Sequence, residues 1–356
     1  MKYFKKTNII LILSVLLFSG CKDILEESPK TIITPDSFSS ATGLRSGLSA
    51  AYSISRAYYG HELGSRTTVY GTDEYHQGQP VNDAAYAVYI ALHPALAEAS
   101  VPWNDAYIAI NTCNGLIELG PDVEGLLEEE KSALIAQAKF LRGHWYFLLA
   151  RHYGGATLDL GSGSLAFNQN PSSALTRDSE DDVLAAVIND LEDAVDELPE
   201  SRPSEPGRVW KASALHLLAK AYLYRGWKNN STTDFQSALD NANDLITNRA
   251  TYGVDLLSSF EDVFVEDNEW SDEVLYSVEW NGNAQFNDAT NSGAATNNIQ
   301  NFLFREFYVS DIPGMVRDVK NGRPWIRYSP SAWMLDVAFN DKENDERYYA
   351  SFQTVW

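Results

Sequence analysis

The chain has 356 residues, of which 44% are hydrophobic and 21% are charged. This balance is too apolar for a disordered chain and too polar for a protein with many membrane spans, so we expect a sizeable folded core. The formal net charge of −22 would repel a phosphate backbone, which excludes nucleic acid as an expected partner.

The N-terminus has the pattern of an export signal. Three lysines within the first six residues precede an apolar run from Ile9 to Phe18, which is too short for a membrane-spanning helix of ~20 residues. A serine and a glycine stand directly before Cys21, which resembles a bacterial lipoprotein processing site where the thiol is lipidated after cleavage. We therefore expect a signal peptide over 1–20 and a lipid anchor at Cys21, the alternative being an ordinary cleaved signal with an incidental cysteine. If Cys21 is lipidated, Cys113 has no disulfide partner.

Helical periodicity dominates the chain as far as about residue 250. Apolar residues spaced three and four apart lie on one face of a helix. This spacing predicts helices over 44–58, 103–117, 134–148, 183–198, 212–222 and 235–245. Trp103 and Trp145 belong to these apolar faces and are predicted to be core residues.

Short breaks between these helices favour antiparallel pairs. The first helix of a tetratricopeptide repeat typically carries two bulky residues, a small one and an aromatic one, followed by glycine. One predicted helix matches this pattern with Leu215, Leu218, Ala219, Tyr222 and Gly226. Phe235 and Ala238 supply the second helix, although Lys228 to Asp234 makes the predicted turn longer than in a regular repeat. We expect a mainly α fold with a tetratricopeptide-like helical-repeat scaffold, long irregular loops and a few short strands. On this spacing alone, an unrelated helical bundle is equally compatible.

One helix carries a more specific pattern. Residues 138–148 read AKFLRGHWYFL and are followed by Tyr153, Gly154 and Gly155. This resembles the recurrent core A-x-F-L-R-A-x-x-Y-F-x-L-x-x-x-Y-G-x-x-P of the SusD/RagB family of outer-membrane glycan-binding lipoproteins. Gly143 replaces the small alanine of that pattern, and Thr157 stands near the expected proline. Further similar stretches lie at 21–38, 177–199, 207–246, 268–278 and 345–347.

The resemblance implies a domain organisation. Residues 1–20 would be the lipoprotein signal peptide, 21–265 a SusD-like N-terminal region with tetratricopeptide-like helix pairs, and 266–356 the start of a loop-rich C-terminal region. Because family members run well beyond this length and residues 352–356 form a strand-like end, we expect that last region to be incomplete.

The resemblance also implies a function. It predicts a non-catalytic lipoprotein that is anchored in the cell outer membrane, faces the exterior and binds oligo- or polysaccharide. The protein would deliver this glycan to a SusC-like TonB-dependent transporter. The alternative is a protein-interaction scaffold or a lid of the transporter that has no glycan affinity of its own.

Residues 280–301 form a polar segment with seven Asn, two Gln and neither Lys nor Arg. Sugars present an apolar ring face and a rim of hydroxyls, so their sites combine a flat aromatic ring with amides and carboxylates. Trp280, Asn283, Phe286 and Asn287 supply this chemistry and are predicted to bind glycan. For Trp280, a core position at the end of a predicted strand from Val274 to Val278 is equally compatible.

Two further loops contribute candidates. The connection from Gly60 to Asn82 is polar and contains glycine, and it carries Tyr70, Asp73 and Tyr75. Loops on a rigid scaffold often perform recognition, although Asp73 also suits a turn or a helix cap. Trp325 lies between arginines that could meet an anionic sugar, and a packed strand position is the alternative.

Enzyme motifs are absent from the sequence. The chain contains no H-E-x-x-H, G-x-S-x-G, P-loop or dinucleotide fingerprint. A carboxylate pair for glycoside hydrolysis is set by the fold, at ~5–10 Å, and 49 acidic residues make any such pair unspecific. Six scattered histidines favour core or surface roles over a metal site. We therefore expect no catalysis, no cofactor and no metal.

Overall fold

The computed structural model describes residues 38–78, 85–160, 175–265, 267–280, 303–304, 313–314 and 326–352. The predicted signal peptide and Cys21 lie outside these ranges. Among the described helices, none is long and apolar enough to cross a membrane.

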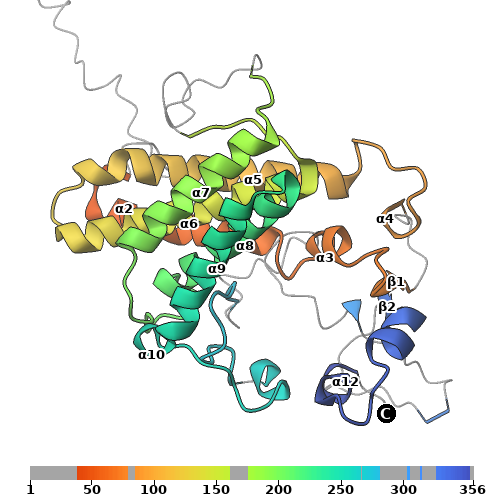
Figure 1. Cartoon of the computed structure of the whole chain (residues 1–356). Helices are drawn as coiled ribbons and strands as arrows, with labels where there is room; N and C mark the ends of the chain where they lie inside the picture. Colours follow the sequence, from red (N-terminus) through yellow and green to blue (C-terminus); the bar gives the residue numbers. More distant parts are fainter. Residues whose placement is uncertain are drawn as a thin grey trace, which may run out of the picture. The chain divides into compact units, whose positions relative to one another are not determined.

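The described chain is mainly helical, as predicted (Figure 1). The helices and helical turns are α2 (Ala41–Ile54), η3 (Ser55–Ala57), α3 (Glu62–Thr68), α4 (Ala85–Val88), α5 (Ala97–Leu119), η4 (Gly120–Asp122), α6 (Glu128–Tyr153), α7 (Glu180–Glu197), α8 (Lys211–Asn229), α9 (Thr232–Thr247), α10 (Arg249–Tyr252), η6 (Glu261–Phe264), η7 (Met334–Ala338) and α12 (Glu346–Ser351). The strands β1 (Tyr75–Gln77) and β2 (Tyr328–Pro330) form one antiparallel pair. Each of the six predicted helices is present.

Sequence-local signals start several helices. Ser40, Ser179 and Ser231 stand before α2, α7 and α9, and each hydroxyl accepts a hydrogen bond from a backbone N–H in the first turn. Such caps satisfy donors that have no partner inside the helix. Acidic residues in the first turns of α6 and α7 also suit the positive end of the helix dipole.

The core is built around α6. Consecutive helices from α5 to α9 pack against one another, and α2 packs on α5 and α6. Trp145 and Tyr146 of α6 are completely buried, while Trp103 of α5 packs at the edge of the same core. The prediction that both tryptophans are core residues is confirmed.

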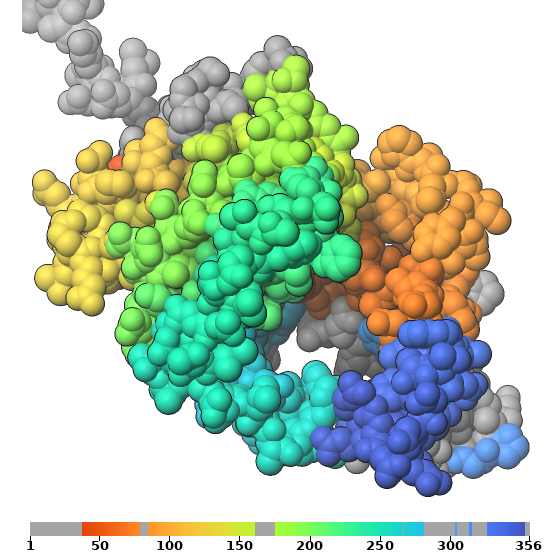
Figure 2. Space-filling model, in the orientation of Figure 1, coloured from red at the N-terminus to blue at the C-terminus, as the bar shows by residue number. Residues whose placement is uncertain are grey.

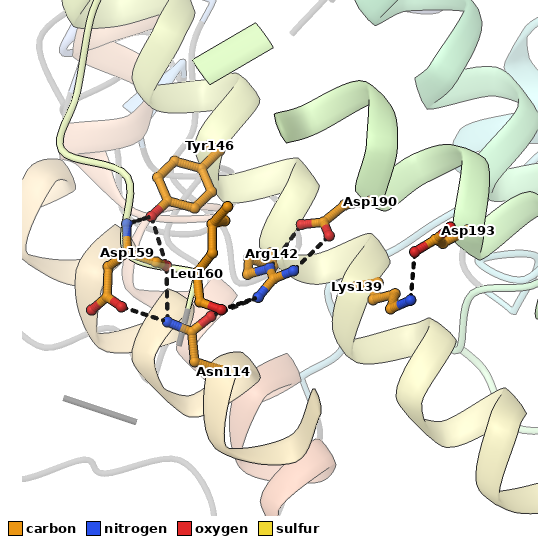
Figure 3. A network of polar contacts seen from close by, with 8 residues as sticks. All are labelled: Asn114, Lys139, Arg142, Tyr146, Asp159, Leu160, Asp190 and Asp193. Atoms are coloured by element: carbon orange, nitrogen blue, oxygen red, sulfur yellow. Dashed lines mark hydrogen bonds and ion pairs between the residues drawn. The ribbon is translucent and has the colours of Figure 1, made fainter. Parts of the chain in front are cut away.

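A polar network joins α6 to its neighbours (Figure 3). The Arg142 guanidinium donates from Nε and Nη2 to the two carboxylate oxygens of Asp190 on α7, at 2.8 and 2.7 Å. Its Nη1 donates to Asn114 Oδ1 on α5, at 2.8 Å. Tyr146 Oη and Asn114 Nδ2 both donate to the carbonyl oxygen of Asp159, each at 2.9 Å. The arginine and tyrosine of the sequence signature therefore connect three helices with the chain that follows α6.

The turn between α8 and α9 is shorter than predicted. Helix α8 continues to Asn229, and Asn230 then takes a left-handed conformation with φ 51° and ψ 42°, which ends the helix. Helix α9 begins at Thr232. The prediction of a lengthened turn over Lys228 to Asp234 is wrong, because helical structure occupies both ends of that range.

The predicted strand from Val274 to Val278 is also wrong. The segment is irregular, and arginine side chains, not a partner strand, donate hydrogen bonds to its carbonyl groups. Arg202 Nη2 donates to the Val274 carbonyl at 3.1 Å, and Arg56 Nε donates to the Glu279 carbonyl at 2.6 Å. Alternating apolar residues therefore pack this segment on helices without placing it in a sheet.

Candidate functional site

Two of the predicted binding loops meet through the strand pair. Strand β1 follows the loop that carries Asp73, and β2 follows the segment that contains Trp325. Tyr75 lies opposite Pro330 in the antiparallel register. Beyond the strands, Gly78 N donates to the Arg327 carbonyl at 3.0 Å, and Ser331 N donates to the Glu74 carbonyl at 2.8 Å. Segments far apart in the sequence thus share one surface region.

Four rings form an aromatic cluster on this strand pair: Tyr70, Tyr75, Phe304 and Tyr328. Tyr70 and Tyr328 meet edge to face at 5.2 Å, as do Tyr75 and Phe304 at 5.3 Å, and the Phe304 and Tyr328 centroids are 4.8 Å apart. Tyr70 and Tyr328 are 4% and 1% exposed, whereas Phe304 is 39% exposed and Tyr75 is half-buried. Two rings therefore support two others that reach the surface.

A network of ion pairs lies next to the aromatic cluster. Tyr328 Oη donates to the Glu62 carbonyl at 3.0 Å. The Arg66 guanidinium pairs with Glu98 at 2.6 Å and with Glu62 at 2.7 Å, and Arg327 pairs with Glu62 at 3.1 Å. These contacts tie α3, α5 and the start of β2 together. The aromatic cluster consequently stands on a rigid base.

The electrostatic surroundings keep the phenols of Tyr75 and Tyr328 neutral. Burial raises the pKa of Tyr75, and the Glu74 carboxylate raises it further. Burial also raises the pKa of Tyr328, with a smaller contribution from Glu62. Both side chains therefore remain protonated at neutral pH and keep an O–H donor.

The predicted site residues have different positions. Tyr70 is buried in the base of the cluster, and Tyr75 lies at its half-buried edge. Asp73 is exposed in the turn before β1, and its carbonyl accepts a hydrogen bond from the Ser331 hydroxyl. Asn283, Phe286, Asn287 and Trp325 lie outside the described residues.

Trp280 lies in a different part of the fold. It ends the segment that passes η3 and packs Tyr276 against Tyr52 and Phe140. The Trp280 ring is partly exposed, but its Nε1–H is buried and has no acceptor among the described residues. A buried indole N–H normally has a partner, so within the described part of the chain this donor is unsatisfied.

Phe304 and Tyr328 were not predicted from the sequence. Phe304 ends the apolar triplet Phe302-Leu303-Phe304, and Tyr328 lies three residues after Trp325. The sequence around each residue is equally typical of an ordinary core residue. The spacing of residues along the chain could not pair them with Tyr75, because their contact depends on strand pairing between distant segments.

Among the described residues, no group of three or more His, Cys, Asp and Glu is arranged to hold a metal ion. The arrangement on the strand pair offers aromatic rings at the surface, the Tyr75 hydroxyl and the exposed Asp73 carboxylate, which suit non-covalent binding of a polyhydroxylated ligand.

Comparisons with known proteins agree with this architecture. A family model for SusD-like proteins, described as starch-binding and associating with the outer membrane, matches residues 24–223. A SusD-like protein of Bacteroides ovatus is 29% identical over 291 residues, which cover 79% of this chain and 51% of the relative. One from Formosa agariphila is 29% identical over 278 residues, with 74% and 50% covered. This chain spans about half the length of the curated relatives it matches.

Solved structures share the fold. A laminarin-binding SusD-like protein superposes with a TM-score of 0.69 at 22% identity, covering 87% of this chain and 66% of that one. A crystal structure with a xylogluco-oligosaccharide gives a TM-score of 0.62 at 26% identity, with 81% and 54% covered. These matches favour the tetratricopeptide-like scaffold over an unrelated bundle. Since the family model also covers more than half of the sequence, the chain belongs to the SusD-like family.

Proposed function

We propose that this protein binds oligo- or polysaccharide at the outer face of the outer membrane and delivers it to a SusC-like TonB-dependent transporter without chemical change. The family description of starch binding and outer-membrane association supports this proposal, as do the solved relatives named for laminarin or containing a xylogluco-oligosaccharide. The observation that carries it is the aromatic cluster, in which Tyr75 and Phe304 reach the surface on a rigid base.

The cluster accounts for capture in physical terms. A sugar ring would stack on Phe304 or on Tyr75, at ~1 kcal/mol for each such contact, and its hydroxyls would donate to the exposed Asp73 carboxylate. Because neighbouring aromatic rings and the strand pair already orient these side chains, little ordering entropy would be lost on binding. Several weak contacts also allow release, which delivery to a transporter requires.

Further residues complete the proposal. The partly exposed ring of Trp280 is proposed as a further stacking surface, and Asn283, Phe286, Asn287 and Trp325 are proposed as additional contacts. Tyr70 would act indirectly by supporting Tyr328. Cys21 is proposed as the lipid anchor that keeps the protein on the membrane.

A second candidate function is a protein-interaction scaffold or transporter lid. Leu223 and Trp227, one helical turn apart on α8, are 46% and 76% exposed. On α9, Leu239 and Ile246 are 51% and 60% exposed and also share a helix face. Exposed apolar surface of this kind often marks a protein contact. This role is compatible with glycan binding.

Affinity electrophoresis of the mature chain from Lys22 against neutral and anionic polysaccharides tests the proposal. We expect one glycan to retard migration, and Tyr75→Ala and Trp280→Ala each to weaken binding about fivefold through lost stacking or hydrogen bonding. Trp227→Ala is the matched control, since it removes an exposed aromatic ring from α8. If no glycan retards the folded protein, the receptor role is rejected and the scaffold role is favoured.

A further inference from the structure

A hollow lies on the helical scaffold. It encloses about 390 Å³ between η3, α3, α6 and α8, within the size range of small-ligand sites, ~300–1,000 Å³. In the space-filling view, the surface is hollowed between the green-to-teal α8 and α9 and the orange α3 region (Figure 2). The lining side chains that matter here are Tyr59, His144, Arg151, His152 and Lys220.

Arg151 and Lys220 differ from every other cation in the described part of the chain. All other described lysines and arginines pair with a carboxylate, apart from Arg56 and Arg177, which donate to backbone carbonyls. Arg151 and Lys220 have neither kind of partner among the described residues. The Arg151 guanidinium lies over the Phe147 ring, 5.6 Å from its centroid. Both residues are exposed, so a ligand from solvent can reach two unpaired cations that line the same hollow.

The described lining of the hollow contains no carboxylate. Burial lowers the pKa of Lys220, and the charge of Arg151 lowers it further. Burial, followed by the charges of Lys220 and Arg151, lowers the pKa of His144 to about 4. Burial and Arg151 likewise lower the pKa of His152. The hollow therefore combines two mutually repelling cations with two neutral imidazoles, and no acid among its described lining residues compensates them.

Hydrogen bonds from tyrosine hydroxyl groups fix the two histidines that line the hollow. Tyr59 Oη lies 2.7 Å from His144 Nε2. Tyr58 Oη lies 3.1 Å from His152 Nε2 and 2.8 Å from the Thr67 hydroxyl. These contacts connect η3 and α3 to α6 and hold both imidazoles in place. This part of the lining is therefore fixed before a ligand arrives.

We propose that this hollow binds an oxyanion group, a carboxylate or a sulfate ester, carried by an acidic saccharide. A guanidinium forms paired hydrogen bonds with such a group, and an ammonium adds a point charge. Binding would relieve the repulsion between Arg151 and Lys220, which no described protein group does. The inference deepens the proposed function by naming a substrate class, and the saccharide part of it rests on that function.

NMR titration of the histidine imidazoles in the mature chain tests the site directly. The probes are glucuronate, glucose 6-sulfate, inorganic sulfate and neutral glucose, each at constant ionic strength. We expect glucuronate and glucose 6-sulfate to shift the His144 and His152 signals, assigned with His144→Gln and His152→Gln. Arg151→Gln and Lys220→Gln should each weaken this binding about tenfold through loss of a charged hydrogen bond.

Lys211→Gln is the matched control. It removes the same charge from α8, and nine residues at 3.6 residues per turn place Lys211 on the opposite side of the helix from Lys220. This control should bind both acidic sugars as the parent does. Circular dichroism and thermal unfolding would show that each variant is folded.

The outcomes separate the two proposals. The oxyanion site is rejected if neither acidic sugar shifts the imidazole signals, or if Lys211→Gln weakens binding as much as Lys220→Gln. If inorganic sulfate binds as tightly as glucose 6-sulfate, the saccharide assignment is rejected. If a neutral polysaccharide retards migration of the protein in affinity electrophoresis but neither acidic sugar shifts the imidazole signals, the proposed function is supported and the oxyanion site is rejected.

Discussion

Arg142 connects α5, α6 and α7 through a single buried guanidinium group, so its partners should control stability. Asp190→Ala would leave that charge without its carboxylate, and we expect a loss of ~3–5 kcal/mol in the free energy of unfolding measured in urea. Arg142→Met combined with Asp190→Leu should recover much of the loss, because no uncompensated charge remains. A loss below about 1 kcal/mol in Asp190→Ala would show that water or another acid replaces the carboxylate.

The buried His144 should make the stability of the protein depend on pH. Its pKa falls from 6.5 to about 4 on folding, mainly through burial. The unfolded chain therefore binds a proton more readily between these values, so the contribution of His144 is present above pH 6.5 and is lost as pH falls to about 4. His144→Gln should remove ~2–3 kcal/mol of the decline in stability between pH 6.5 and 4. A parent-to-variant difference that does not change with pH would contradict this.

At the scale of elements, two glycines show how closely the helices approach. A Cβ on Gly226 of α8 would lie 2.8 Å from ring carbons of Phe235 on α9. On Gly143 of α6, it would lie 3.3 Å from Leu191 Cγ on α7. Both positions gain ~1 kcal/mol of helix propensity when glycine becomes alanine. Only the first also has a severe steric clash.

We therefore expect Gly226→Ala to lower stability by ~1–3 kcal/mol, and Gly143→Ala to be close to neutral. Thermal unfolding of both variants compares them directly. Phe235→Leu should partly rescue Gly226→Ala, because it removes the ring that the new methyl group meets. Equal effects at the two glycines would mean that helix packing around Gly226 adjusts freely.

At the scale of the whole molecule, the net charge of −22 opposes the approach of any acidic ligand. Raising the salt concentration from ~10 to ~150 mM shortens the screening length from ~30 to ~8 Å, which should increase the association rate of an acidic oligosaccharide. The association rate of a neutral oligosaccharide should not change. Stopped-flow fluorescence measures both rates. An association rate that falls with salt would show that Arg151 and Lys220 dominate the approach.

Sequence periodicity predicted the helices, because the apolar spacing that stabilises a helix acts within a few residues of the chain. The signature in α6 was readable for the same reason, since Arg142, Tyr146 and Trp145 all lie on one helix. The turn after Lys228 and the strand at 274–278 were predicted wrongly. The turn is short because Asn230 ends α8 and Ser231 caps α9, whereas tertiary partners hold the segment at 274–278 in an irregular conformation.

The sequence by itself determined that this is a helical, acidic protein of the SusD-like type with candidate binding loops. Only the tertiary structure decided which residues meet: β1 pairs with β2, Tyr75 with Phe304, and Arg151 with Lys220 in one hollow. Helix formation depends on neighbours three or four positions away, and the sequence displays these directly. A binding surface depends on side chains brought together from distant segments, and their contacts exist only once the helices have packed.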